Sequence, residues 1–143
     1  MLIRRLLMAG SFLLFTCALS VNSYGAEYAS VKELCAASAK EFQKINQLKG
    51  FMPDQLSDAD YQTILKAAEI MVANESARQS KFNLDTNTSN ISKLTATHAG
   101  RIAERAKGDK VGLIEDVGHN FRFLFLSCRS CHQIYQTEAG LAP

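Results

Sequence analysis

The scarcity of proline is the feature that most constrains the fold of this chain. Proline, which breaks helices and interrupts central strands, occurs only at Pro53 and Pro143. No segment alternates apolar and polar residues as a half-buried strand would. Apolar residues instead recur three or four positions apart, which is the spacing of one face of a helix. The sequence therefore predicts an all-α fold.

Helix signals define two helices in the first half of the chain. The first is predicted over 29–49, and Gly50 and Pro53 mark its end. The second begins at Ser57, because Asp60 follows three residues later and the two resemble a capping box. Both helices carry an apolar stripe along one side.

A polar segment precedes the other two helices. Residues 83–90 are rich in Asn, Thr and Asp, which predicts a loop. The third helix is expected over 91–107, with Gly108 beyond its end, and the fourth from about Asp109. Four amphipathic helices with short connections predict an antiparallel bundle, whose facing stripes can build a cofactor site in the core.

The predicted fourth helix carries the motif Cys128-Arg129-Ser130-Cys131-His132. Its two thiols and its imidazole stand at positions i, i+3 and i+4, so they share one helix face. Cys-x-x-Cys-His is the attachment signature of c-type haem. The sequence thus predicts one covalent haem c, with thioether bonds at Cys128 and Cys131 and with His132 as ligand of the iron.

Two other uses of the cysteine pair remain open. A redox dithiol usually stands at a helix start within a βαβ pattern, which is lacking around this motif. A zinc site needs two further ligands, and the other Cys and His residues beyond position 25 form no second pair: Cys35, His98 and His119. A haem-free metal or redox protein is therefore the alternative from another class.

The beginning of the sequence predicts export. A basic start and an apolar run over 6–19, followed by small residues, are typical of a secretory signal peptide, here 1–25. Cleavage leaves one domain, 26–143, in the periplasm, without stable membrane insertion. Two alternatives stay open: the run could remain as a membrane anchor, or lipid could be attached at Cys17.

Charge and composition indicate neither nucleic-acid binding nor catalysis. The chain has 16 Lys and Arg against 14 Asp and Glu, and two of the basic residues, Arg4 and Arg5, lie in the predicted signal peptide. The remaining charges balance, so the basic pI of the whole chain is no evidence for an anionic partner. No constellation of acid, base and nucleophile stands out, and we do not expect an enzyme.

The chain resembles the class II cytochromes c, the cytochrome c prime family. The haem motif stands near the end of the chain, an aromatic residue, Tyr135, follows its histidine by three positions, and a signal peptide precedes a four-helix pattern. The resemblance implies an up-down-up-down four-helix bundle with haem in the core. It also implies that Cys128 and Cys131 are thioether sites and that His132 is the proximal ligand.

The family divides at the second axial position of the iron. Some members place a Met from the first helix there and carry electrons, whereas others leave an apolar cap and bind nitric oxide or carbon monoxide. Residues 29–49 contain no Met. We therefore expect five-coordinate iron that binds a small gas, with a distal side lined by residues from this set: Leu34, Ser38 and Phe42. The alternative is a six-coordinate one-electron carrier with a redox partner protein, using His98 or Met52.

Other residues carry weaker expectations. His98 is expected to be a hydrogen-bonded histidine of the core or pocket rim, and His119 a surface residue. Cys35 is expected to be a buried free thiol, with an intermolecular disulfide as the alternative. The apolar run 121–126 fits burial against two neighbouring helices, a wall for the porphyrin, or the surface of a homodimer.

Overall fold

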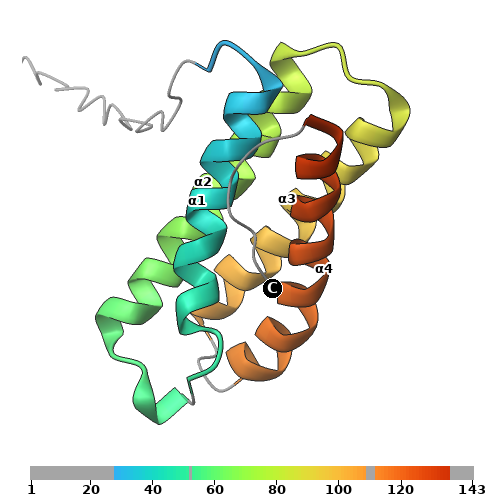
Figure 1. Cartoon of the computed structure of the whole chain (residues 1–143). Coiled ribbons are helices and arrows are strands. Elements are labelled where there is room, and N and C mark those ends of the chain that lie inside the picture. Colours follow the sequence, from blue (N-terminus) through green and yellow to red (C-terminus); the bar gives the residue numbers. More distant parts are fainter. Residues whose placement is uncertain (1–27, 52, 109–111, 136–143) are drawn as a thin grey trace, which may run out of the picture.

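The computed structural model of the chain describes residues 28–51, 53–108 and 112–135. These residues form a bundle in which each helix packs against the next and the last packs back against the first (Figure 1). The described elements are α1 (Val31–Leu48), the short 3-10 turn η1 (Pro53–Gln55), α2 (Asp58–Lys81), α3 (Thr86–Lys107) and α4 (Gly112–Tyr135). The predicted all-α, antiparallel four-helix bundle is confirmed. The predicted signal peptide 1–25 and Met52 lie outside the described residues.

The start of α2 forms as its sequence predicts. The Ser57 hydroxyl accepts a hydrogen bond from the backbone N–H of Asp60 at 3.3 Å, and the Asp60 carboxylate accepts the N–H of Ser57 at 2.8 Å. The capping box is therefore complete, although Asp replaces the usual Glu. The hydrogen bonds from Ser57 also hold the pKa of Asp60 below its ordinary value.

The loop predicted over 83–90 is wrong for residues 86–90, which form the first turns of α3. Asp85 caps this helix, because its carboxylate accepts the N–H groups of Asn87 and Thr88 at 2.9 and 3.0 Å. The inward positions of these turns hold Thr88 and Ser92, both buried. The segment is polar because the end of the core that it faces is polar, so a composition that is typical of a loop here belongs to a helix.

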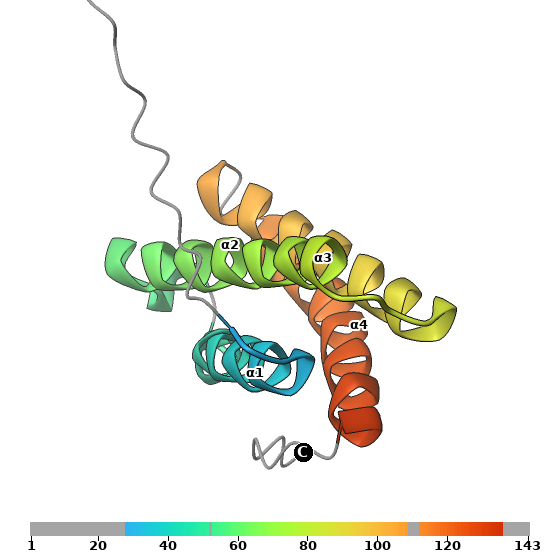
Figure 2. The ribbon, with the colours of Figure 1, turned by 90° about the horizontal axis from the view of Figure 1, so that it is seen from above.

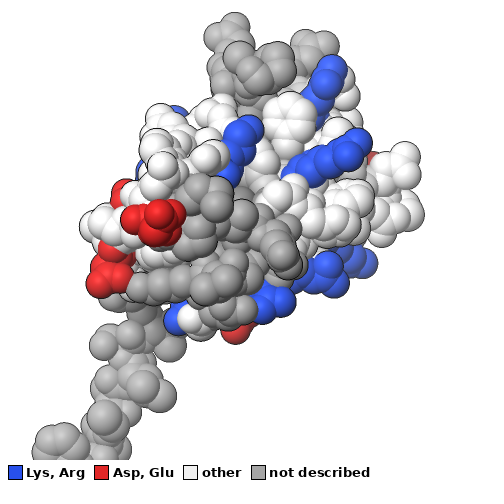
Figure 3. All heavy atoms as spheres, turned by 90° about the horizontal axis from the view of Figure 1, so that it is seen from below, with Lys and Arg blue, Asp and Glu red and all other residues white. Residues whose placement is uncertain are grey.

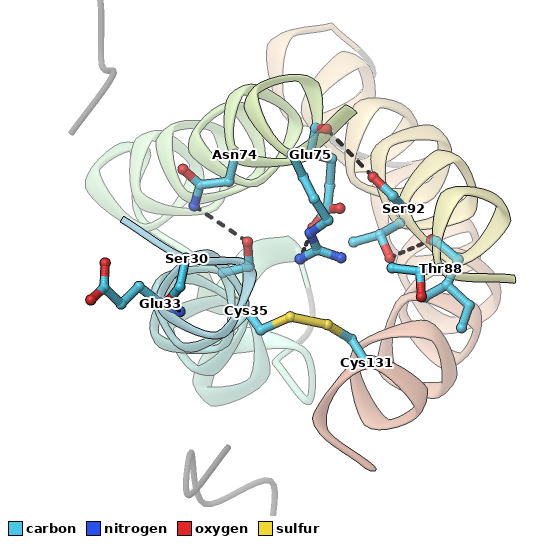
Figure 4. The surroundings of a disulfide bond; sticks show 12 residues. Ser30, Glu33, Cys35, Asn74, Glu75, Thr88, Ser92 and Cys131 are labelled. Carbon is cyan, nitrogen blue, oxygen red and sulfur yellow. Dashed lines mark hydrogen bonds and ion pairs between the residues drawn. A yellow bond between two sulfur atoms is a disulfide. The ribbon is translucent and has the colours of Figure 1, made fainter. Parts of the chain in front are cut away.

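The two ends of the core differ in chemistry. One end is apolar and is centred on the stacked rings of Phe42 and Phe121, 4.7 Å apart. Further buried side chains of this apolar end come from all four helices: Ile45, Tyr61, Ile64, Ala68, Ile102 and Leu124. The other end holds buried polar side chains that surround the cysteines (Figure 4): Ser38, Asn74, Glu75, Arg78, Thr88, Ser92 and Thr95.

The polar end is where the beginnings of α1 and α3 meet the ends of α2 and α4 (Figure 1). In the view from above, the last turns of α4 lie on the same side of α2 and α3 as α1 does (Figure 2). The face at the opposite end of the bundle carries spread basic side chains and a group of acidic ones at one side (Figure 3). Because the cysteine motif stands near the end of α4, it lies at the polar end.

The apolar run 121–126 divides between the two sides of α4. Phe121 and Leu124 are buried in the core, whereas Phe123 and Leu126 are exposed. The interpretation that this segment is buried against neighbouring helices therefore holds for Phe121 and Leu124 but not for Phe123 and Leu126.

The apolar end should supply much of the stability. Phe42→Ala removes a ring that is 1% exposed and should lower the free energy of unfolding by about 3–5 kcal/mol. Phe51→Ala is the matched control, because Phe51 follows α1 and is 47% exposed; its effect should stay within about 0.5 kcal/mol. Urea unfolding measures both. Equal losses would contradict the described core.

Candidate functional site

The two cysteines and the histidine of the motif share the inward face of α4. Cys128, Cys131 and His132 are all buried, whereas Arg129 points to solvent. This is the arrangement that the i, i+3, i+4 spacing predicts. The three side chains open on a common cavity in the polar end of the core.

That cavity is small and is bounded by all four helices. Residues from α1, α2 and α3 complete its lining: Cys35, Ser38, Glu75, Arg78 and Thr95. Its volume is about 10 Å³, which is roughly the space of one water molecule. The motif therefore faces a small interior space that is lined by buried side chains, most of them polar.

A disulfide between Cys35 and Cys131 closes one side of this interior (Figure 4). The bond joins α1 to α4, and the two Cα atoms are 6.7 Å apart. The expectation that Cys35 is a free thiol is therefore wrong, and so is the alternative of an intermolecular bond. Cys35 is buried as predicted, but the sequence alone does not show which thiol it faces. Cys131 cannot carry a thioether while it is bonded to Cys35, so the predicted bond to haem and this disulfide exclude each other.

Cys128 is the free thiol among the described cysteines. Burial, aided by the nearby carboxylate of Glu75, raises the pKa of Cys128 to about 12. The thiol therefore stays protonated at neutral pH. Because the thiolate is the reactive form, Cys128 is unreactive while the core is closed.

A buried ion pair stands next to the cysteines. Arg78 Nη2 lies 3.0 Å from Glu75 Oε1, and both side chains are 1% exposed. Three of their polar atoms, Glu75 Oε2 and Arg78 Nε and Nη1, have no hydrogen-bond partner among the described residues. Burial raises the pKa of Glu75, and the positive charge of Arg78 opposes that shift. Buried charges with unpaired atoms are costly, so this pair offers polar groups that a bound molecule could satisfy.

His132 is suited to hold a metal. Burial lowers its pKa, and the positive charge of Arg78 lowers it further. The imidazole is therefore neutral at neutral pH, and a neutral ring nitrogen can donate its lone pair to an iron.

The other predicted residues occupy different places. His98 Nδ1 lies 3.0 Å from Asn120 Oδ1, and the His98 ring stacks on Phe123, which confirms a hydrogen-bonded core histidine. His98 is not part of the cavity lining. His119 is exposed, as expected. Leu34, Ser38 and Phe42, which are expected to line a distal side, are all buried. Of the three, Ser38 lines the cavity.

Sequence reasoning did not find Glu75 and Arg78. Both lie within α2 at positions three apart, as surface ion pairs of helices often do. These two side chains differ from a surface pair in that they point into the core, and only the three-dimensional structure shows this. No family model matches this chain, and no curated protein does. The resemblance to class II cytochromes c thus stays a prediction from the motif and the helix pattern.

The disulfide gives a direct prediction for the chain made without haem attachment. Peptide mapping without reductant should recover the peptides of Cys35 and Cys131 joined, and reduction should lower the free energy of unfolding by about 2–4 kcal/mol because a long loop is released. Mass spectrometry and urea unfolding measure the two effects. Separate peptides before reduction would contradict the bond.

The buried ion pair predicts an asymmetric response to mutation. Arg78→Met leaves Glu75 buried without its partner and should cost about 3–5 kcal/mol, part of which Glu75→Gln in the same chain should restore. Lys107→Met is the control, because its ion pair with Glu69 is 49% exposed on both sides and should contribute less than about 1 kcal/mol. Equal losses in urea unfolding would show that Arg78 is not buried as described.

Proposed function

We propose that this chain is an exported c-type haem protein. It carries one haem through thioether bonds at Cys128 and Cys131, with His132 as axial ligand of the iron. The observation that supports this most is that these three side chains share one buried face of α4 and open on the same cavity. A bound haem supplies an iron that exchanges one electron or binds small gases.

The chemistry of the cavity fits such a group. Haem carries two carboxylates, and Arg78 presents two unpartnered nitrogens within the same interior. Charge-assisted hydrogen bonds between a guanidinium and a carboxylate are among the stronger hydrogen bonds in proteins. An anionic group would therefore relieve part of the cost of burying Arg78.

The volume of the cavity does not fit haem while the disulfide is present. A space of about 10 Å³ is far smaller than a porphyrin, so α1 and α4 must separate first. Among the neighbouring helix pairs, α1 and α4 have the least extensive contact. Once an external dithiol has reduced the Cys35–Cys131 bond to two thiols, becoming a disulfide itself, the contact between α1 and α4 is the one that can open with the smallest loss of packing.

Gas binding is the function that we place first. α1 holds no methionine, and His98 is engaged with Asn120 outside the cavity lining. The iron then keeps a side at which nitric oxide or carbon monoxide can bind.

One-electron transfer is the second candidate. It is favoured by the polar character of the α1 residues that face the motif, Cys35 and Ser38, where a gas-binding site of this kind would have an apolar cap. A haem-free redox protein is the third, favoured by the disulfide next to the free thiol of Cys128.

A periplasmic location is part of the proposal. The predicted signal peptide and the disulfide both support it, because disulfides persist in oxidising compartments. Within the three described ranges, no helix has the length and apolarity to cross a membrane.

Covalent haem is the decisive test. Protein made in a host with haem-attachment machinery should show, by mass spectrometry under denaturing conditions, the processed chain plus one haem. The double change Cys128→Ala with Cys131→Ala should abolish the added mass, whereas Ser130→Ala, inside the same motif, should keep it. Finding only bare polypeptide in the unchanged protein would refute the proposal.

The same preparations separate the first two candidates. Carbon monoxide added to the reduced protein should shift its optical spectrum if the iron offers a binding position. His132→Ala should leave covalent attachment possible but change the spectrum, because the iron loses its protein ligand on α4.

A further inference from the structure

The fold adds a third sulfur to the two of the motif. A cysteine pair needs two further ligands to hold zinc, and the sequence shows no second pair near it. In the structure, Cys35 of α1 meets the motif, because its sulfur crosses to Cys131 of α4 (Figure 4). Four donor side chains therefore line one cavity: Cys35, Cys128, Cys131 and His132.

These donors form a complete ligand set for one metal ion. Three cysteines and one histidine are among the usual ligand sets of structural zinc, which is bound by four ligands at the corners of a tetrahedron. Sulfur and imidazole ligands favour zinc over hard cations such as Mg²⁺ and Ca²⁺, which prefer oxygen. All four side chains are buried, and the Cα atoms of Cys35 and Cys131 are 6.7 Å apart. Two packed helices thus supply the whole set.

The size of the cavity suits a single ion. Its volume of about 10 Å³ is roughly the space of one water molecule. A zinc ion needs no more space than that, and it binds sulfur at about 2.3 Å. The cavity that is far too small for a porphyrin is therefore of the right size for a metal ion, with α1 and α4 still packed together.

Arg78 supplies a positive neighbour for such a site. A zinc ion with three thiolates and a neutral imidazole carries one negative charge, which is costly to bury without a partner. The guanidinium of Arg78 lines the same cavity. Its Nη2 bonds Glu75, whereas its Nε and Nη1 have no partner among the described residues. These two N–H groups can donate to thiolate sulfurs, as the outer partners of metal ligands do.

We propose that the haem-free chain, with its disulfide reduced, binds one zinc ion through Cys35, Cys128, Cys131 and His132. The inference goes beyond the proposed function, since it concerns the chain before haem attachment and needs no haem. With the disulfide intact, the described residues present no group of three or more side chains that could hold a metal, and two of the sulfurs are then bonded to each other. Zinc and the disulfide are therefore alternative links between α1 and α4.

The step from the disulfide to the metal site is balanced. An external dithiol transfers two electrons and two protons to the Cys35–Cys131 bond and becomes a disulfide itself. The three thiols then each release one proton to solvent as their sulfurs bind Zn²⁺, because a thiol that binds a metal is deprotonated. A lone pair of the His132 ring completes the site, and the zinc ion keeps its oxidation state throughout.

The test adds zinc to the haem-free chain in its two redox states. One sample is reduced in urea by a phosphine and refolded without oxygen, and the other keeps its disulfide. Mass spectrometry under native conditions should find one zinc ion on each reduced chain and none on the disulfide form. A reduced chain that takes up no zinc, or a disulfide form that takes up as much, overturns the inference.

Cys35→Ser separates this site from one that uses the motif alone. Loss of an outer partner of a metal ligand costs about 10–100-fold in affinity, so loss of Cys35 should weaken zinc binding at least that much. With Co²⁺ as a coloured substitute, the sulfur-to-metal absorption should fall from that of three sulfurs to that of two. His119→Ala removes an exposed histidine of α4 and is the control, which should bind as the unchanged chain does. Equal affinity in Cys35→Ser overturns the inference.

A further measurement needs no variant. X-ray absorption at the zinc edge of the reduced, unchanged chain should detect three sulfur neighbours and one nitrogen, and a site with two sulfurs or fewer also overturns the inference. The proposed function is judged separately, by the haem mass of protein made with attachment machinery. Failure of either proposal is therefore recognised without reference to the other.

Discussion

The buried ion pair of Glu75 and Arg78 is the interaction that makes one end of the core of this bundle polar. Two charges removed from water need polar surroundings, and the neighbouring helices supply part of them: the hydroxyls of Ser92 on α3 and Ser38 on α1 lie near the Glu75 carboxylate and oppose the rise of its pKa. The cost of this polar end is offset elsewhere, by the stacked rings of Phe42 and Phe121 and the apolar side chains around them. The bundle therefore separates the apolar end, which stabilises the fold, from the polar end, which surrounds the cysteines.

The disulfide and the haem motif compete for one sulfur atom. In the described structure Cys131 joins α1 to α4 through its bond to Cys35, and the small cavity belongs to this state. The proposed thioether at Cys131 needs the same sulfur. Burial also keeps Cys128 protonated by raising its pKa to about 12, and Cys131 is held in the disulfide, so neither sulfur of the motif is a reactive thiolate in this structure. The proposed attachment of haem therefore requires that the disulfide is reduced and that α1 and α4 separate.

The sequence was sufficient for features that depend on local spacing. The capping box at Ser57, the four helices and the common face of the motif all follow from intervals of three and four residues. The sequence did not predict features that depend on the three-dimensional surroundings of a residue. The polar composition of residues 86–90 predicts a loop, whereas these residues form the first turns of α3. Thr88 and Ser92 face a polar end of the core, which no local sequence pattern indicates. The partner of Cys35 was missed for the same reason, because the two sulfurs are 96 positions apart in the chain and meet only when α1 and α4 pack together.

The bond between Cys35 and Cys131 also changes the topology of the domain. It ties the first helix to the last, so that most of the folded chain becomes one covalent ring. A protease that cuts the connection between α2 and α3 would then produce no separate fragments: the two helical hairpins stay linked through sulfur and packed along their shared core. In this state a single cut leaves the two halves of the bundle covalently joined. The halves can separate only after a reductant has cleaved the disulfide.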